Sequence, residues 1–202
     1  MKNNQKHWET VYETKQPNEV SWTQEIPTIS LEFLREFNLP KTANIIDVGG
    51  GDSKFVDYLL QEKFENITVL DISEQALSKA KKRLGKKAEK IKWIVSDITE
   101  YEPTEIYDLW HDRAVFHFLT TQEQIQDYLK IAESAVSNYV VVATFSKTGP
   151  KKCSGLDIKQ YSEEDLEARF KRKFKKLQCK TENHVTPFQT IQNFTFCSFQ
   201  KK

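Results

Sequence analysis

Short apolar stretches alternate with longer amphipathic stretches through the middle of the chain. The apolar stretches are rich in β-branched and aliphatic residues, which predicts β-strands at residues 44–48, 67–70, 91–95, 106–110 and 139–143. Between them, apolar residues at helical spacing predict helices at residues 55–63, 73–84 and 122–135. Apolar strands that alternate with helices favour a doubly wound parallel sheet with helices on both faces.

The pattern changes toward the carboxyl end of the chain. Residues 174–185 and 190–200 alternate apolar and polar positions over long stretches, which predicts two antiparallel strands that form a hairpin. A helix at residues 162–170 is expected before this hairpin, after a loop. The fold class is therefore α/β, with an antiparallel hairpin added to the parallel sheet.

The first 40 residues are expected to form a lid over the carboxyl edge of the sheet. They contain the aromatic residues Trp8, Tyr12 and Trp22, followed by a helix at about residues 25–37. No linker or repeat divides the chain. We expect a single domain over residues 1–202, made of three parts: a lid (1–40), a cofactor-binding core (41–145) and a loop, helix and hairpin (146–202).

Composition and charge agree with one globular domain. The 202 residues include 30 Lys and Arg against 29 Asp and Glu, so the net charge of +1 gives no overall field for nucleic acid or membranes. The 38% of hydrophobic residues can supply a core despite a mean hydropathy of -0.63. We find no apolar window long enough for a membrane span and no apolar region of a secretion signal, so we expect a cytoplasmic protein.

Local basic runs and the cysteines do not change this interpretation. The run at residues 79–92 falls largely on a predicted helix, where lysines between apolar positions form a solvated face, and nucleic acid is not expected as a partner. Cys153, Cys179 and Cys197 are odd in number and widely spaced, so we expect reduced thiols. The histidines and cysteines show no metal-ligand spacing, and no metal site is expected.

A glycine-rich turn follows the first predicted strand directly. Gly49, Gly50 and Gly51 stand where an open parallel sheet binds ligands, beyond the carboxyl end of a strand and before a helix. The second strand ends at Asp71, 20 residues after Gly51, where a carboxylate can accept hydrogen bonds from both ribose hydroxyls. The spacing indicates a ligand that contains a nucleoside.

Two departures argue against a dinucleotide. A dinucleotide turn has Gly or Ala three positions after Gly51, where this chain has Lys54. Asp47 lies two residues before Gly49, where it would repel a pyrophosphate but would suit a ligand that carries an ammonium and a sulfonium group. The turn therefore favours a cationic ligand.

Taken in order, these motifs resemble those of the class I S-adenosylmethionine-dependent methyltransferases. Residues 47–53 are similar to the family's acidic-x-Gly-x-Gly-x-Gly motif, with Ser53 in place of the last glycine. Asp71 matches the acid that binds the ribose, and Asp97 matches the residue that faces the adenine amino group. The resemblance extends over about residues 42–145.

The resemblance implies a fold and a cofactor. The fold is a Rossmann-like, doubly wound sheet of seven strands, mostly parallel, in which the antiparallel seventh strand lies beside the sixth. The cofactor is S-adenosylmethionine, with S-adenosylhomocysteine as product. The residues expected to hold it are Asp47, Gly49, Gly50, Gly51, Asp71, Ile72, Asp97, Ile98, Asp112 and Trp22.

The acceptor side is expected at the end of the fourth strand. Residues 110–119, with the amino-terminal aromatic residues, look like those of small, mostly bacterial methyltransferases without an assigned acceptor. His111 is a candidate catalytic base, because histidine accepts protons near neutral pH, and Asp112 could orient an amine or the cofactor. Alternatively, Asp112 pairs with Arg113 or caps the next turn. Tyr12 and Trp22 could form an aromatic wall, although packing alone also explains them.

These features predict an enzyme, an S-adenosylmethionine-dependent methyltransferase. Its expected acceptor is a small molecule, because the lid would enclose a pocket. A protein lysine side chain is the alternative acceptor. From a different class, the chain could bind S-adenosylmethionine without turnover, as a sensor or scaffold, or it could be a dehydrogenase on a similar sheet. The sequence leaves the acceptor atom and the oligomeric state open.

Overall fold

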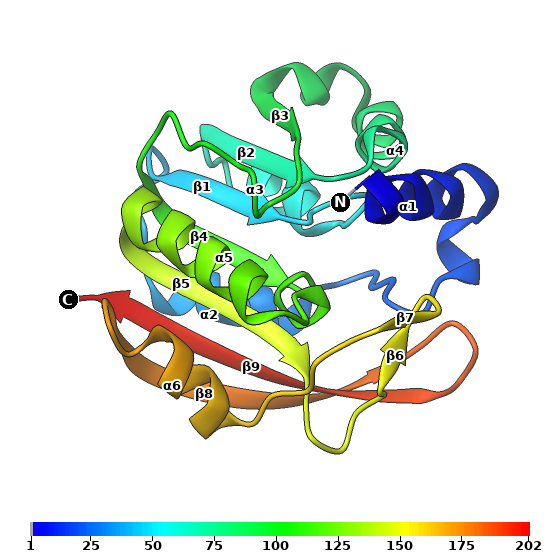
Figure 1. Cartoon of the computed structure of the whole chain (residues 1–202). Coiled ribbons are helices and arrows are strands. Elements are labelled where there is room, and N and C mark those ends of the chain that lie inside the picture. The colour runs from blue at the N-terminus through cyan, green and yellow to red at the C-terminus, as the bar shows by residue number, and fades with distance from the viewer. Residues whose placement is uncertain (1) are drawn as a thin grey trace.

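Seven strands form one mixed sheet in the computed structural model, which describes residues 2–202 and the side chains of residues 4–202. The strand order is β3-β2-β1-β4-β5-β9-β8 (Figure 1). Strands β1 to β5 are parallel to one another, and β9 is antiparallel to both β5 and β8. The predicted Rossmann-like sheet with an antiparallel carboxyl-terminal hairpin is confirmed. The strands are β1 (Asn44–Val48), β2 (Asn66–Asp71), β3 (Ile91–Val95), β4 (Tyr107–Arg113), β5 (Val136–Phe145), β8 (Phe174–Val185) and β9 (Ile191–Lys201).

Helices cover both faces of the sheet. One face is covered by α2 (Thr28–Glu36), α3 (Phe55–Gln61) and α4 (Glu74–Leu84), and the other by α5 (Gln122–Ala135) and α6 (Glu163–Phe170). Short 3-10 turns occur at Pro17–Glu19 (η1), Gly85–Lys90 (η2) and Phe116–Phe118 (η3). No helix in the described part of the chain is long and apolar enough to cross a membrane.

Side chains alternate between the two faces along each strand. In β1, Ile45 packs with α2 and α3, whereas the next residue, Ile46, packs on the face that α5 covers. Both are fully buried, which explains why the central strands are almost continuously apolar. The same alternation decides which residues of β4 face the functional site.

Two amino-terminal elements differ from the sequence expectation. The segment before Pro17 forms a helix, α1 (Lys2–Thr14), which lies beside α4 at the carboxyl ends of β1 and β2 (Figure 1). The helix expected at residues 25–37 is shorter, because Pro27 occupies its N-cap position and α2 begins only at Thr28.

Two further elements differ in the second half of the chain. β4 continues past residue 110 to Arg113, which carries the strand to the edge of the site. The loop after β5 contains a small hairpin of β6 (Lys152–Cys153) and β7 (Leu156–Asp157). This hairpin is too short to leave a strand pattern in the sequence.

The expectation of three reduced cysteines is wrong for two of them. Cys179 and Cys197 form a disulfide, and Cys153 is the buried free cysteine. The antiparallel register places Cys179 of β8 directly opposite Cys197 of β9, with their Cα atoms 4.1 Å apart. Cross-strand register cannot be read from cysteine spacing alone, so the sequence argument missed this pair.

Candidate functional site

A cavity of about 400 Å³ lies at the carboxyl ends of the central strands, beneath α1. It brings together residues that are far apart in the sequence, from Asn4 to Cys153. Of the predicted site residues, those that line it are Trp22, Asp47, Gly49, Gly50, Asp71, Ile72, Asp97, Ile98 and His111. Gly51 and Asp112 are not among the lining residues, although Gly51 packs against Tyr12 and Asp71, which are.

The glycine turn leaves room for a ligand close to the backbone. Gly49 has a φ of +65° and Gly51 a φ of +45°, a backbone region that glycine enters without strain. A Cβ on Gly50 would lie 2.7 Å from both Oδ2 of Asp47 and a methyl group of Val69. The turn is fixed to the next strand by hydrogen bonds from the Gly49 and Gly50 N–H groups to the carbonyl oxygen of Leu70, at 2.7 and 3.2 Å.

Asp47 presents one bound and one free carboxylate oxygen. Nδ1 of His111 donates to Oδ1 of Asp47 at 2.7 Å, while Oδ2 is buried and has no hydrogen-bond partner in the described chain. Nε2 of His111 lies 2.8 Å from Oγ of Ser30, and Phe55 stacks on the imidazole at 4.1 Å. Both ring nitrogens are therefore engaged, and the histidine holds the carboxylate in place. The unsatisfied Oδ2 is a costly group to bury unless a ligand donates to it.

Two further carboxylates follow at the ends of β2 and β3. Oδ1 of Asp71 accepts a hydrogen bond from the Ser73 N–H at 2.8 Å, and burial, with a smaller contribution from Asp47, raises the pKa of Asp71 to about 7. Oδ1 of Asp97 accepts from the Thr99 N–H at 2.9 Å and from the Thr99 hydroxyl at 2.8 Å. Asp71 and Asp97 thus lie on neighbouring strands along one edge of the cavity.

The prediction that Asp112 contacts the cofactor or the acceptor is wrong. Asp112 is fully buried on the opposite face of β4 from His111, because adjacent strand residues point to opposite sides. It accepts hydrogen bonds from the Val115 N–H at 2.8 Å and from the Tyr128 hydroxyl at 2.7 Å. Burial raises its pKa to about 6. Asp112 caps the turn after β4, the alternative that the sequence left open.

Arg113, the next residue, lines the cavity and does not pair with Asp112. Its Nη1 donates to the carbonyl oxygen of Trp22 at 3.0 Å, and the guanidinium lies 4.8 Å from the centre of the Phe194 ring. Nε and Nη2 are buried without a hydrogen-bond partner in the described chain. Burial lowers the pKa of Arg113 to about 10, so the side chain remains cationic at neutral pH.

Four aromatic rings form one wall of the cavity. Trp8 lies 5.5 Å from Trp22 and 5.2 Å from Phe118, and Tyr12 lies 6.2 Å from Trp22, measured between ring centres. All four residues line the cavity. The spacing of four between Trp8 and Tyr12 places both on one face of α1. The sequence analysis did not predict Phe118 as a cavity residue, because the short segment with Phe116 and His117 shows neither a helical nor a strand pattern of apolar positions.

Similarity to known proteins agrees with this geometry. Residues 46–138 match the family described as "Methyltransferase domain". Malonyl-[acyl-carrier protein] O-methyltransferase 1 of Ilyobacter polytropus is 32% identical over 144 residues, which cover 70% of this chain and 51% of that protein. N-terminal Xaa-Pro-Lys N-methyltransferase 1 of Xenopus tropicalis is 30% identical over 103 residues, 48% of this chain and 45% of that protein.

Solved structures share the fold. An S-adenosylmethionine-dependent methyltransferase from Anabaena variabilis matches with a TM-score of 0.75 at 14% identity, covering 100% of this chain and 94% of that one. Magnesium protoporphyrin IX methyltransferase from Synechocystis with bound S-adenosylhomocysteine matches with a TM-score of 0.70 at 14% identity, covering 99% and 94%. Residues 46–138 thus match a methyltransferase domain, and the fold of the chain is that of S-adenosylmethionine-dependent methyltransferases. The matched part of the chain spans 33% and 51% of the length of two curated relatives, malonyl-[acyl-carrier protein] O-methyltransferases 2 and 1 of Ilyobacter polytropus.

The cofactor of a class I methyltransferase, S-adenosylmethionine, fits the residues of this cavity. The unpartnered Oδ2 of Asp47 suits the ammonium group, and Gly50 packs so closely against Asp47 and Val69 that a Cβ there would displace this carboxylate. Asp71 would hold the ribose and Asp97 the adenine. The sequence motifs predicted these residues, and the structure places Asp47, Gly50, Asp71 and Asp97 in the cavity lining; their contacts with the cofactor stay a prediction.

Glu9 connects the amino-terminal helix of this methyltransferase to the cofactor half of the cavity. Its carboxylate accepts hydrogen bonds from the Ser73 hydroxyl at 3.0 Å and from the N–H groups of Glu74 and Gln75 at 2.7 and 3.0 Å. It thus caps the amino terminus of α4 from another helix. The sequence carries no signal for this contact, because the partners are more than sixty residues apart.

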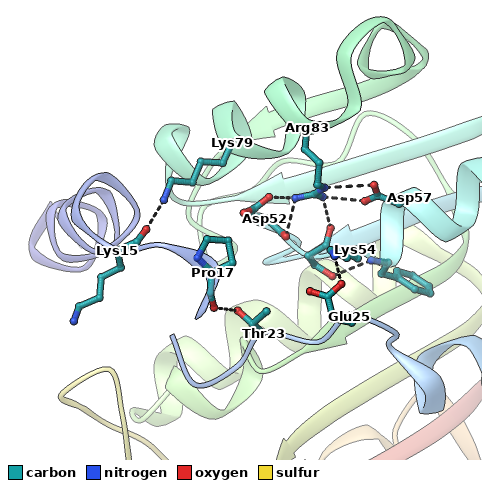
Figure 2. A network of polar contacts seen from close by, with 11 residues as sticks. Lys15, Pro17, Thr23, Glu25, Asp52, Lys54, Asp57, Lys79 and Arg83 are labelled. Carbon is teal, nitrogen blue, oxygen red and sulfur yellow. Dashed lines mark hydrogen bonds and ion pairs between the residues drawn. The ribbon is translucent and has the colours of Figure 1, made fainter. Parts of the chain in front are cut away.

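Charged side chains hold the rim of the methyltransferase cavity (Figure 2). Arg83 of α4 pairs with Asp52 of the glycine turn and with Asp57 of α3, and it also donates to the backbone oxygens of Asp52 and Ser53 at 3.0 and 2.9 Å. Lys54 pairs with Glu25, which fastens the turn to the segment before α2. No cluster of three His, Cys, Asp or Glu side chains that could hold a metal ion occurs in the described residues.

Proposed function

We propose that this chain transfers the methyl group of S-adenosylmethionine to a small-molecule acceptor. The observation that carries the proposal is the cavity beneath α1, which is lined by Asp47, with its free carboxylate oxygen, by Asp71 and by the aromatic wall. A lid this close to the glycine turn leaves space for a compact acceptor. The three-part division of one domain and a cytoplasmic location stay predictions from the sequence.

S-adenosylmethionine supplies an electrophilic methyl group on a sulfonium. The residues of the chain would bind and orient the cofactor and the acceptor, and they would exclude water. Asp47, held by His111, would fix the amino end of the cofactor, and Asp71 would fix the ribose. The aromatic wall of Trp8, Tyr12, Trp22 and Phe118 would keep water out and face the cation with its ring electrons. Alignment of the reacting groups in a dry site can supply most of the rate enhancement.

His111 is assigned as a positioning residue rather than a base. It is the one histidine that lines the cavity among the described residues, and both its nitrogens are engaged by Asp47 and Ser30. Burial raises the pKa of the Tyr12 phenol well above its ordinary value and that of the Cys153 thiol to about 12, so both stay protonated at neutral pH. We propose that the acceptor is already nucleophilic when it binds.

The relatives support methyl transfer but differ in acceptor. The Ilyobacter polytropus proteins are named as O-methyltransferases of malonyl-[acyl-carrier protein], and the Xenopus tropicalis protein as an N-methyltransferase of an amino-terminal Xaa-Pro-Lys sequence. A protein lysine acceptor is therefore the second candidate. The fixed positive charge of Arg113 in the cavity argues against an ammonium-bearing acceptor, because like charges repel there.

Transfer of labelled methyl groups tests the function. The protein is incubated with methyl-labelled S-adenosylmethionine and, separately, with the small-molecule and the protein fractions of a cell extract. With the wild-type protein, we expect label in a small molecule. With the Gly50→Ala variant in its place, we expect no label. Label in a protein band would favour the lysine alternative. No label in either fraction, with S-adenosylhomocysteine binding intact, would favour a protein that binds the cofactor without turnover.

A further inference from the structure

We propose that Arg113 binds a carboxylate of the methyl acceptor, and that the acceptor is therefore a small carboxylic acid. This inference rests on the proposed methyl transfer, and it names the class of acceptor. The carboxylate bound by Arg113 is either the group that is methylated or a second group that positions the acceptor beside the methyl group.

The order of the strands places Arg113 on the acceptor side. The carboxylates expected to contact the cofactor follow each other across the sheet, with Asp97 after β3, Asp71 at the end of β2 and Asp47 in β1. Arg113 ends β4, the next strand in this order, and the register aligns Val48 of β1 with the residue before it. A cofactor that spans β3 to β1 therefore leaves Arg113 beyond its methionine end.

The free donors of Arg113 form the edge that recognises a carboxylate. Nη1 is used by the Trp22 carbonyl oxygen, which fixes the plane of the guanidinium. Nε and Nη2, which have no partner in the described chain, lie along one edge of the guanidinium, and their in-plane N–H groups can donate two parallel hydrogen bonds to one carboxylate. A buried cation with two unmade hydrogen bonds is costly, and a ligand carboxylate would satisfy both.

No side chain of the described residues takes that position. Arg113 forms no ion pair within 4.0 Å with a described side chain. The charges of Glu182 of β8 and of Asp47 are near enough to raise its pKa, but burial has the larger effect and lowers it. Glu182 Oε1 accepts from Gln24 Nε2 at 2.9 Å, and its Oε2 is also unpartnered. The neighbouring His117 and His184 are kept neutral, since burial and the charge of Arg113 lower the pKa of both.

Charge and shape together select the acceptor. The Phe194 ring lies against the guanidinium, and the aromatic wall leaves an apolar surface on the cavity side. A compact organic anion satisfies the cation, whereas an ammonium would meet a like charge. A carboxylate is nucleophilic at neutral pH without a general base, which agrees with a cavity whose histidine is already engaged at both nitrogens.

The experiment measures binding of defined acids to the protein saturated with S-adenosylhomocysteine. Acetate, malonate, succinate and benzoate are titrated by calorimetry, each beside its amide as the uncharged counterpart. The wild type should bind at least one acid more than tenfold more tightly than the amide. Arg113→Gln should lose about 10- to 100-fold in affinity for that acid, as expected when hydrogen bonds to a charged group are removed. The affinity of Arg113→Lys for the acid should lie between that of the wild type and that of Arg113→Gln.

Two controls separate this role from a structural one. S-adenosylhomocysteine affinity should stay within about threefold in both Arg113 variants, which also shows that they fold. Arg35→Gln makes the same chemical change on the exposed surface of α2, outside the cavity lining, and should bind the acid as the wild type does. If Arg113→Gln fails to fold, the comparison of each acid with its amide on the wild type and on Arg113→Lys decides.

Three outcomes would overturn the assignment. These are equal binding of every acid and its amide by the wild type, unchanged acid binding by Arg113→Gln, and a tenfold loss of S-adenosylhomocysteine affinity in that variant, which would assign Arg113 to the carboxylate of the cofactor. With cofactor binding intact, such results leave the proposed methyl transfer standing. Failure of the wild type to bind S-adenosylhomocysteine would instead overturn the proposed function, and the acceptor role of Arg113 with it.

Discussion

Glu9 of α1 binds Ser73, the N-cap residue of α4, through a hydrogen bond of 3.0 Å from the serine hydroxyl. Ser73 Oγ also accepts from the Ala76 N–H at 3.1 Å, and its own N–H donates to Asp71. One residue therefore joins the lid helix, the start of α4 and the carboxylate expected to hold the ribose. Because Trp8 and Tyr12 flank Glu9 on α1, this bond fixes where the aromatic wall stands.

Replacing Glu9 with Gln should loosen the lid without unfolding the core. The amide keeps one acceptor oxygen instead of two and loses the charge that favours the helix amino terminus, so we expect a loss of about 0.5–2 kcal/mol in the free energy of unfolding. S-adenosylhomocysteine affinity should fall, and trypsin should cleave α1 sooner. Glu13→Gln, an exposed residue of the same helix, is the control. Equal protease sensitivity in both variants would contradict the role of Glu9.

Cofactor binding should depend on pH through Asp71. Its pKa in the folded protein is raised from the ordinary 3.8 to about 7, mainly by burial, and the ionised form is the better acceptor for ribose hydroxyls. S-adenosylmethionine affinity should therefore rise about tenfold from pH 6 to pH 8. Since the folded pKa lies above the unfolded one, the contribution of Asp71 to stability falls as pH rises from about 4 to about 7. Calorimetry on Asp71→Asn should give a flat profile, and a flat profile in the wild type would refute the assignment.

The fold and the cofactor half of the site were predictable because local patterns determine them. Four strands or helices, at residues 44–48, 91–95, 122–135 and 174–185, match the expectation at both ends, since apolar patterns and caps such as Thr121 are local signals. The glycine turn and Asp71 follow from motifs at fixed offsets from a strand. Each of these features depends on residues within a few positions of each other.

The acceptor half was less predictable because it depends on contacts between distant segments. The sequence placed His111 and Asp112 together, but strand alternation sends one to the cavity and the other behind the sheet. The partner of His111, Ser30, is 81 residues away, and nothing local marks it. Which of two adjacent polar residues faces the site is settled only by the register of β4 against β1.

His111→Ala should weaken cofactor binding and stability together. The substitution leaves both oxygens of Asp47 buried without a partner, which costs about 1–3 kcal/mol for the newly unsatisfied group. Urea denaturation and calorimetry with S-adenosylhomocysteine measure the two effects. Ser30→Ala removes only the distal bond and should show a smaller change in both. A variant of His111 that binds S-adenosylhomocysteine normally but turns over slowly would restore the histidine as a catalytic base.

Gly50→Ala should block the cofactor by bulk alone. The φ of Gly50 lies outside the left-handed region, so alanine adds no backbone strain, but its Cβ would lie 2.7 Å from Oδ2 of Asp47. The carboxylate must move from the position that suits the ammonium group. We expect at least a tenfold loss of affinity, about 1.4 kcal/mol, together with a loss of thermal stability, because the Cβ would also lie 2.7 Å from a methyl group of the buried Val69. Wild-type affinity in this variant would show that the cofactor does not approach the turn.

The Cys179–Cys197 disulfide should stabilise the outer hairpin of the sheet. It joins the edge strand β8 to β9 across a sequence separation of 18, and a loop of about this length restricts the unfolded chain by about 3 kcal/mol. Without reductant, the denatured protein should therefore show one reactive thiol, from Cys153, and three after reduction. Thiol counting with Ellman's reagent and urea denaturation with and without reductant measure these effects. Cys197→Ser should reproduce the reduced protein, whereas Cys153→Ser should keep the gain from oxidation. Three thiols in the denatured protein after exposure to oxidised glutathione would show that the two cysteines do not pair.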